Sequence, residues 1–89
     1  MLKIEFAKSF KKSYKKLNQK EKELFENISL KLANNETLEA KYKDHALKGD
    51  FIGFRECHLR PDLLLIYQIQ DDKLVLYCLD IGSHSELFQ

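Results

Sequence analysis

Three histidines are the side chains of this 89-residue sequence best suited to proton transfer: His45, His58 and His84. Imidazole titrates near neutral pH, so it can act as a general acid or as a general base. A lone histidine is more often structural, but three at the ends of the expected strands suggest a shared site. Basic side chains that can bind phosphate oxygens stand near them in the sequence: Lys43, Lys48, Arg55 and Arg60.

Two kinds of site could use these histidines. The first is a metal site formed by the three histidines, with Cys57 as a fourth ligand. Neighbouring residues of a strand point to opposite faces, so Cys57 and His58 cannot easily bind one ion, and no CxxC or HExxH spacing occurs. The second cleaves RNA with no cofactor: a base activates the 2′-hydroxyl, an acid protonates the leaving 5′-oxygen, and cations stabilise the phosphate. The spacing favours the second.

The histidines fall in the half of the chain that carries strand patterns. Residues 36–50 are polar and loop-like, and they contain His45. Strands are expected over three ranges, separated by turns at 60–62 and 71–72, namely 51–58, 63–70 and 74–81. The continuous apolar run of the second range indicates the central strand.

The first part of the chain predicts a strand followed by two helices. Residues 2–6 alternate in polarity, and the apolar residues Phe6, Phe10, Tyr14 and Leu17 then recur every three or four positions. Asn18 and Glu21 have the spacing of a capping box that begins a second helix, and Asn34-Asn35 is expected to end it.

The element order βααβββ predicts an α+β fold in a single domain over residues 1–89. The helical hairpin should pack on one face of a mainly antiparallel sheet of four or five strands. No apolar run is long enough to cross a bilayer and no signal peptide is evident, so we expect a cytoplasmic protein that makes no membrane contact. Cys57 and Cys78 are expected to be free thiols, because strands on either side of a central one hold them too far apart to bond.

The charge distribution is uneven although the net charge is only +1. Residues 1–22 carry a net charge of +6 and the remainder −5. Five lysines form a stripe on the polar side of the first expected helix: Lys8, Lys11, Lys12, Lys15 and Lys16. Such a stripe is either a solvated helix face or a surface for nucleic acid or an acidic partner.

Three ordered segments, YKDHALKG, FRECHLRPDLLLIY and GSHSELF, resemble the motifs of the YafQ branch of the RelE/ParE toxin superfamily. The resemblance covers roughly residues 42–88, and the expected strand–helix–helix start fits the rest. It implies a RelE-like fold and a type II toxin–antitoxin toxin. Such a toxin is an endoribonuclease that cuts mRNA codons in the ribosomal A site and is inhibited by a cognate antitoxin. We expect that antitoxin to be a small ribbon-helix-helix protein.

The resemblance places the family's catalytic residues on His45, His58, Asp62, His84 and Phe88. Phe88 would stack on a base or pack under His84, although by itself it could equally cover a sheet edge. Asp62 by itself would be only a turn residue after Pro61.

Two positions depart from the family pattern. Many relatives carry a basic residue where this chain has Asp80, and some carry an aromatic residue where it has Leu63. An acid that faced the site would repel phosphate, so either Arg55 supplies the charge or the nuclease is slow. The alternatives are a ParE-like toxin that acts on a DNA topoisomerase without catalysis, and an inactive member that only binds its antitoxin. ParE-like chains generally lack this histidine set.

Overall fold

The computed structural model describes residues 1–88. Its helices are α1 (Lys8–Tyr14), α2 (Gln19–Ala33) and α3 (His84–Leu87). Its strands are β1 (Lys3–Phe6), β2 (His45–Ala46), β3 (Arg55–Arg60), β4 (Leu63–Gln70) and β5 (Val75–Gly82). Short 3-10 helices occur at η1 (Ala40–Tyr42), η2 (Gly49–Phe51) and η3 (Asp71–Lys73). Within the described residues, no helix has the length and hydropathy needed to cross a membrane.

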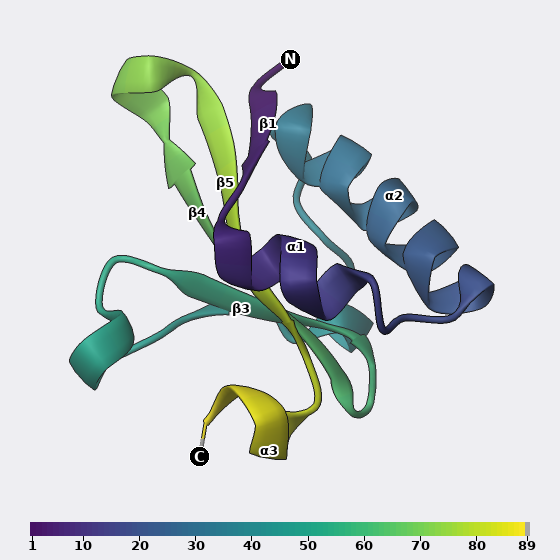
Figure 1. Cartoon of the computed structure of the whole chain (residues 1–89). Coiled ribbons are helices and arrows are strands. Elements are labelled where there is room, and N and C mark those ends of the chain that lie inside the picture. The colour runs from purple at the N-terminus through teal and green to yellow at the C-terminus, as the bar shows by residue number, and fades with distance from the viewer. Residues whose placement is uncertain (89) are drawn as a thin grey trace.

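The strands form one sheet in the order β1-β5-β4-β3-β2 (Figure 1). β1 runs parallel to β5, and every other neighbouring pair is antiparallel. The helices α1 and α2 lie together on one side of this sheet, while α3 follows the end of β5. The α+β class, the helical hairpin and the mainly antiparallel sheet are confirmed.

The core lies between this helical hairpin and the sheet. Alternate residues of β4, namely Leu63, Leu65 and Tyr67, are at most 4% exposed and pack in one cluster with Phe10 of α1 and Phe25 of α2. Burying one such side chain stabilises the fold by about 1.5–3 kcal/mol. The cluster therefore holds β4 rigidly, and β4 in turn fixes its neighbours β3 and β5.

The other face of β4 has a smaller apolar layer. Leu64 and Ile66 are each 1% exposed but lie outside the helix-side cluster. The Gln68 side-chain amide donates a hydrogen bond of 3.1 Å to the carbonyl oxygen of Gly53, which ties the loop at 47–54 over this face. The face opposite the helices is thus partly covered by a loop and remains open where β2 and β3 meet.

The first two helices follow the sequence signals with one difference. The capping box forms as predicted: the Asn18 side chain accepts from the Glu21 backbone N–H at 2.8 Å, and Glu21 accepts from the Asn18 backbone N–H at 2.9 Å. After α2, Asn35 adopts φ 60°, a left-handed conformation common at helix ends. The first helix begins at Lys8 rather than at Phe6, because Phe6 pairs with Cys78 in the sheet.

Two predicted boundaries in the second half are wrong. The strand expected over 51–58 begins only at Arg55, since Phe51 ends η2 and Gly53 adopts φ 92°, a value that favours glycine. His45 does not lie in a loop but in β2, where it pairs with Glu56 of β3. This two-residue strand forms the edge of the sheet beside β3. It places His45 directly opposite Glu56.

The two cysteines lie on either side of β4 and are free thiols, as predicted. Cys57 pairs with Leu65 and Cys78 with Tyr67, so the whole central strand separates them. Both are fully buried, and burial raises the pKa of Cys57 and raises that of Cys78 to about 12. Neither side chain is therefore available as a nucleophile near neutral pH.

Candidate functional site

The strand β3 presents two chemically active side chains to the face opposite the helices. Cys57 and Leu59 point into the helix-side core, so Glu56 and His58 point the other way. Their partners in β4 are Ile66 and Leu64, which belong to the smaller apolar layer. Both side chains therefore project from the rigid centre of the sheet and not from a loop.

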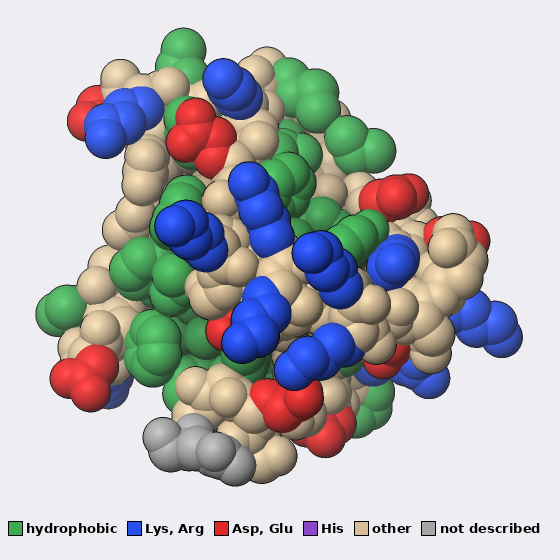
Figure 2. Space-filling view, viewed as in Figure 1, with side chains coloured by type: hydrophobic (Ala, Val, Ile, Leu, Met, Phe, Trp, Pro, Cys, Tyr) green, Lys and Arg blue, Asp and Glu red, His purple; other side chains and the backbone are tan. Residues whose placement is uncertain are grey.

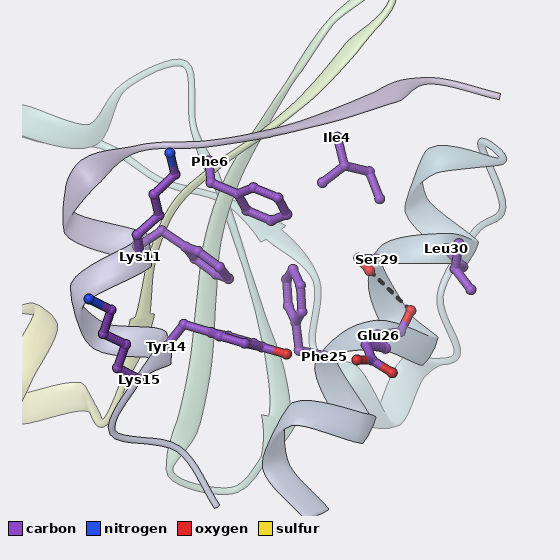
Figure 3. Close-up of a pocket in the computed structure, with 10 residues that line it drawn as sticks. Ile4, Phe6, Lys11, Tyr14, Lys15, Phe25, Glu26, Ser29 and Leu30 are labelled. Carbon is purple, nitrogen blue, oxygen red and sulfur yellow. Dashed lines mark hydrogen bonds between the residues drawn. The ribbon is translucent and has the colours of Figure 1, made fainter. Parts of the chain in front are cut away.

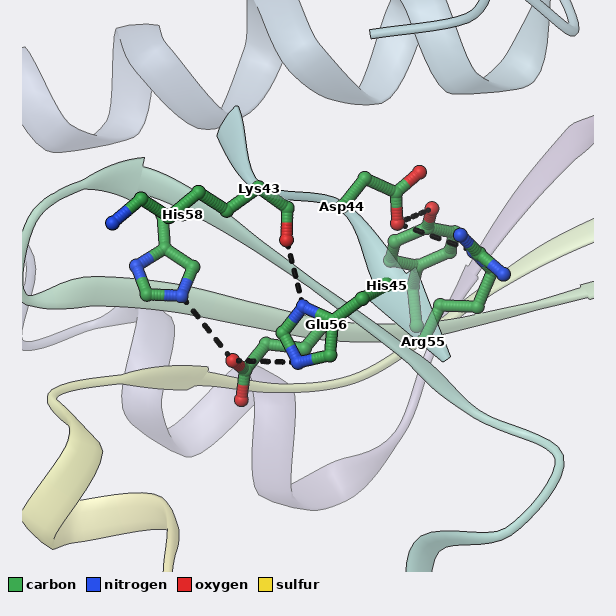
Figure 4. A network of polar contacts seen from close by, with 7 residues as sticks. Lys43, Asp44, His45, Arg55, Glu56 and His58 are labelled. Carbon is green, nitrogen blue, oxygen red and sulfur yellow. Dashed lines mark hydrogen bonds and ion pairs between the residues drawn. The ribbon is translucent and has the colours of Figure 1, made fainter. Parts of the chain in front are cut away.

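A carboxylate lies between two imidazole rings at this point (Figure 4). His58 Nε2 is 3.3 Å and His45 Nε2 is 3.6 Å from the same oxygen, Oε1 of Glu56. The ring centroids of the two histidines are 6.5 Å apart. Glu56 is only 5% exposed, whereas the His45 side chain is 50% exposed. The buried carboxylate therefore orients both rings, and at least one of them is open to solvent.

The orientation of the His45 ring is also fixed from its other side. Its Nδ1 lies 2.7 Å from the carbonyl oxygen of Lys43, which can only accept a hydrogen bond. Nδ1 must therefore carry the hydrogen, and Nε2, which faces Glu56 Oε1, is the ring nitrogen that can exchange a proton. Lys43 adopts φ 49°, so the turn that places this carbonyl is a left-handed one.

The third histidine stands at the first turn of α3. Ser83 and Glu86 form a capping box, with bonds of 2.8 and 3.3 Å, and the backbone bond from Ser83 lowers the pKa of Glu86. The His84 backbone N–H donates to Asp62 Oδ1 at 3.1 Å. The structure thus places Asp62 against the backbone of His84 at the start of this helix.

Phe88 packs under His84, one of the two arrangements expected for it. The two ring centroids are 5.1 Å apart, and the ring centroids of Phe88 and Phe51 of η2 are 5.5 Å apart with the planes at 80°. The ring therefore links α3 to the loop that covers the sheet. This contact holds the His84 ring from one side.

The sheet register relates His84 to the other two histidines. His58, Leu64 and Gly82 form one row across β3, β4 and β5. Two strand spacings separate the ends of this row by roughly 9–10 Å, and His84 follows two residues later. His45 and His58 are therefore in one cluster, and His84 lies across β4 from them at the same end of the sheet.

Arg55 does not join the histidines, contrary to the sequence-based expectation. It follows the alternation of β3 and faces the helix side, where its Nε lies 3.2 Å from Asp44 Oδ1. The Tyr67 hydroxyl donates to the same oxygen at 2.8 Å, and burial together with this bond raises the pKa of Tyr67. The network anchors Asp44, and so the turn before His45, to the sheet (Figure 4).

The side chain of Asp80 accepts hydrogen bonds from neighbouring residues. Asp80 Oδ1 accepts hydrogen bonds from the Ser13 hydroxyl at 2.6 Å and from the Ile81 backbone N–H at 2.8 Å. Its carboxylate is therefore directed to α1. The other residue that departs from the family pattern, Leu63, is buried in the helix-side core.

The remaining predicted phosphate-binding residues divide into two groups. Lys43 and Arg60 line a hollow together with His58. Lys48 lies exposed at the start of η2, in the loop over the sheet. The lysines of the α1 stripe are all exposed and gather over that helix in Figure 2, where none of the three histidine side chains is visible. The lysine stripe and the histidine cluster therefore occupy different faces of the protein.

The cluster of His45, Glu56 and His58 does not have the arrangement of a metal centre. Among residues 1–88, no group of three or more His, Cys, Asp and Glu side chains could hold a metal ion. What the cluster offers instead is a pair of proton-transfer groups held by one carboxylate.

Glu56 is the site residue that the sequence reasoning missed. Its signal was present, because a residue two positions before His58 on the same strand must share its face. An acid at that position is unusual on a buried strand, which also carries Cys57 and Leu59.

A family model and a curated relative both match this chain over nearly its whole length. The family described as "Bacterial toxin of type II toxin-antitoxin system, YafQ" matches residues 2–89. The mRNA interferase toxin YafQ of Escherichia coli K12 is 34% identical over 88 residues, which are 96% of this chain and 94% of that protein.

Solved structures resemble the whole fold. A metal-bound toxin from Helicobacter pylori is 46% identical with a TM-score of 0.87, over 99% of this chain and 100% of that one. The YafQ chain of the E. coli DinJ-YafQ complex is 32% identical with a TM-score of 0.83, over 100% of both chains.

Proposed function

The chain belongs to the YafQ family of bacterial type II toxin–antitoxin toxins, and from this premise we propose that it is an mRNA interferase. It is then an endoribonuclease that cleaves mRNA on the ribosome and is inhibited by a cognate antitoxin. The observation that carries the proposal is the convergence of His45 and His58 on the buried Glu56 carboxylate, on an open face of the sheet.

The reaction that suits these groups uses the nucleophile that RNA itself carries. The 2′-hydroxyl oxygen bonds to the adjacent phosphorus while the bond from phosphorus to the 5′-oxygen breaks. One imidazole accepts the proton of the 2′-hydroxyl and another donates a proton to the departing 5′-oxygen. The products are a 2′,3′-cyclic phosphate and a 5′-hydroxyl, and no proton is gained or lost overall.

The described residues suggest a division of labour in this reaction. His45, His58 and His84 supply the acid and the base, and Glu56 holds two of the rings. Lys43, which lines the hollow beside His58, would stabilise the negative charge on the scissile phosphate. Asp62 and Phe88 hold His84 in place from its backbone and from its ring.

Mapping of cut ends in a translating extract tests the proposed function. Addition of the purified protein should produce mRNA fragments with 5′-hydroxyl ends at codon positions, and the cognate antitoxin should suppress them. Growth arrest on induction without any such fragments would contradict the proposal. Inhibition of a DNA topoisomerase would then favour the ParE-like alternative.

Cleavage is expected to be insensitive to removal of transition metals, because side chains carry out both proton transfers. The protein should be stripped with EDTA, exchanged into metal-free buffer and assayed in extract that contains a chelator selective for transition metals. The Mg²⁺ that ribosomes need stays in place. Cleavage should proceed at the rate of untreated protein. A loss of activity that zinc or copper restores would overturn the acid–base assignment. The metal-bound relative from H. pylori makes this comparison informative.

The antitoxin is proposed to cover an apolar groove between β1, α1 and α2 (Figure 3). The groove encloses about 650 Å³ and is lined by the rings of Phe6, Phe10, Tyr14 and Phe25. Phe6 is 40% exposed and Leu30 at the other edge is 48% exposed, which leaves apolar surface unpaired. Single-stranded RNA needs a cationic track, whereas an apolar groove beside cations fits an amphipathic acidic protein segment.

Charge complementarity should then come from Lys11 and Lys15, which rim the groove. We expect Lys11→Ser with Lys15→Ser to weaken antitoxin binding roughly tenfold at low salt, about 1.4 kcal/mol, because exposed pairs contribute about 0.2–1 kcal/mol each. The salt dependence of binding should become flatter. Fluorescence titration at several salt concentrations measures both.

The control for these lysines is Lys73→Ser, which removes one positive charge from the exposed tip of the β4–β5 hairpin. It should leave antitoxin affinity and its salt dependence unchanged. If the double variant also behaves like wild type, the stripe is only a solvated helix face. If it instead loses ribosome binding, the stripe contacts ribosomal RNA.

A further inference from the structure

A hollow of about 430 Å³ opens directly beside His58, between η1 and the turn that joins β3 to β4. Its volume lies in the range typical of small-ligand sites. His58 forms part of its wall, so whatever occupies it lies next to the proton-transfer cluster. The proposed mechanism uses only His58 and Lys43 from this lining and leaves the rest of the hollow unexplained.

The lining of the hollow combines an apolar floor with cations. Leu24 of α2, Leu59 and Pro61 provide the apolar part, and the ring of Tyr42 stands at one side. Three cationic side chains complete it: Lys41, Lys43 and Arg60. None of the lining residues is acidic.

The positively charged side chains around the hollow can bind an anion. Lys41 and Lys43 are exposed, and Lys41 Nζ lies over the Tyr42 ring, 5.2 Å from its centroid. Arg60 is 49% exposed, and its Nη1 is 4.0 Å from Glu21, the limit of an ion pair. Such a weak surface pair holds the guanidinium near the hollow without occupying its other donors.

We propose that this hollow is a subsite for the nucleotide next to the scissile phosphodiester. The base would lie on the apolar floor beside Tyr42, and Lys41 and Arg60 would bind its phosphate. This inference rests on the proposed function, because His58 is both a wall of the hollow and a proposed proton-transfer group. An aromatic ring with flanking cations is the usual binding surface for single-stranded RNA, since each base offers an apolar face and each phosphate a charge.

The subsite adds a specificity element that the histidine cluster does not provide. The floor offers stacking and apolar contact, so it discriminates by the size of the base more than by its hydrogen-bonding edge. Purines, which have the larger stacking surface, should be preferred at this position over pyrimidines. The nucleotide flanking the cut should therefore be biased although no residue reads its sequence.

Titration with a mononucleotide tests the subsite without a ribosome. Adenosine 3′,5′-bisphosphate added to the ¹⁵N-labelled protein should shift the backbone amides of residues 41–43 and 58–60 saturably, with a Kd of about 1 mM. Lys41→Ser with Arg60→Gln should weaken this binding roughly tenfold or more, because both cations proposed to bind the phosphate are removed. Lys73→Ser, at the other end of β4, should bind as wild type does.

Three results would overturn the subsite. These are an absence of saturable shifts at those amides, shifts centred on the lysines of α1, or a double variant that binds the nucleotide like wild type. A double variant that loses only antitoxin affinity would assign the hollow to the partner protein and would also reject the proposal. If the double variant is unfolded, Lys41→Ser alone decides, because Lys41 is fully at the surface.

Cleavage in the translating extract separates this inference from the function on which it rests. If wild type cleaves mRNA and the double variant cuts at the same rate and the same positions, only the subsite is wrong. If wild type does not cleave but binds the nucleotide at these residues, the nuclease function fails and the nucleotide site stands. We expect the double variant to cleave roughly tenfold more slowly and with a weaker purine bias.

Discussion

Replacing His84 by alanine is expected to lower the rate of mRNA cleavage by roughly 10²–10⁴-fold, the usual loss when a general acid or base is removed. The fold should barely change. His84 is exposed, and its hydrogen bond to Asp62 comes from its backbone N–H, which is present in any residue type but proline. A change of within about 0.5 kcal/mol in unfolding free energy is therefore expected. Rates in the translating extract and a thermal melt of the purified variant measure the two quantities.

The control for His84 is Ser85→Ala, which changes the next residue of the same short helix and should cleave at the wild-type rate. Truncation after Ser83 removes both His84 and Phe88 and should match the loss in His84→Ala. His45→Ala should resemble it too, and the double variant should be little worse, because groups that act in one step are not additive. A folded His84→Ala protein with wild-type activity would remove α3 from the active site.

The second large effect is expected at Glu56. Its carboxylate is the common partner of His45 and His58, so Glu56→Ala removes the contact that orients His58 and one of the two contacts that orient His45. Displacement of catalytic groups by about 1 Å can cost 10²-fold, and we expect a loss of that order in cleavage. Glu56→Gln keeps an oxygen that can accept from a ring nitrogen and should lose clearly less. The nitrogen chemical shifts of the two rings should report altered tautomer populations in Glu56→Ala.

An exposed carboxylate elsewhere provides the comparison for Glu56. Glu36→Ala removes an acid that follows α2 and should change neither the cleavage rate nor the ring shifts. If Glu56→Ala lowers the rate but leaves both histidine rings unchanged, Glu56 acts on the substrate directly and does not position the rings. If the rate itself is unchanged, the carboxylate has no part in the reaction.

Structural features that depend on a few neighbouring residues are predicted correctly from the sequence. The Asn18–Glu21 capping box, the end of α2 at Asn34 and the range of β4 all depend on local hydrogen bonding and on alternation. The same kind of signal marks α3, where Ser83 and Glu86 repeat the capping-box spacing, yet it was not used. A search for this spacing alone would have predicted the helix that carries His84.

The wrong expectations come from treating nearness in sequence as nearness in space. Arg55 is three residues from His58, but an odd separation on a strand places the two on opposite faces. Glu56, at an even separation, shares the face of His58. The strand β2 could not be predicted in the same way, since two residues form a strand only by virtue of their partners in β3. Its position, and therefore that of His45, is a property of the folded sheet.

The parallel pairing of β1 with β5 has a consequence for biosynthesis. Ile4 pairs with Leu76, so the first strand to be made waits for the last one before it gains a partner. β5 also lies between β1 and β4, and neither the sheet nor the row from His58 to Gly82 is complete without it. A chain whose synthesis stops before about residue 82 therefore lacks both the complete sheet and the histidine of α3. A cut in the message for this chain ahead of the codon for residue 82 would therefore give a fragment with an incomplete sheet and without His84.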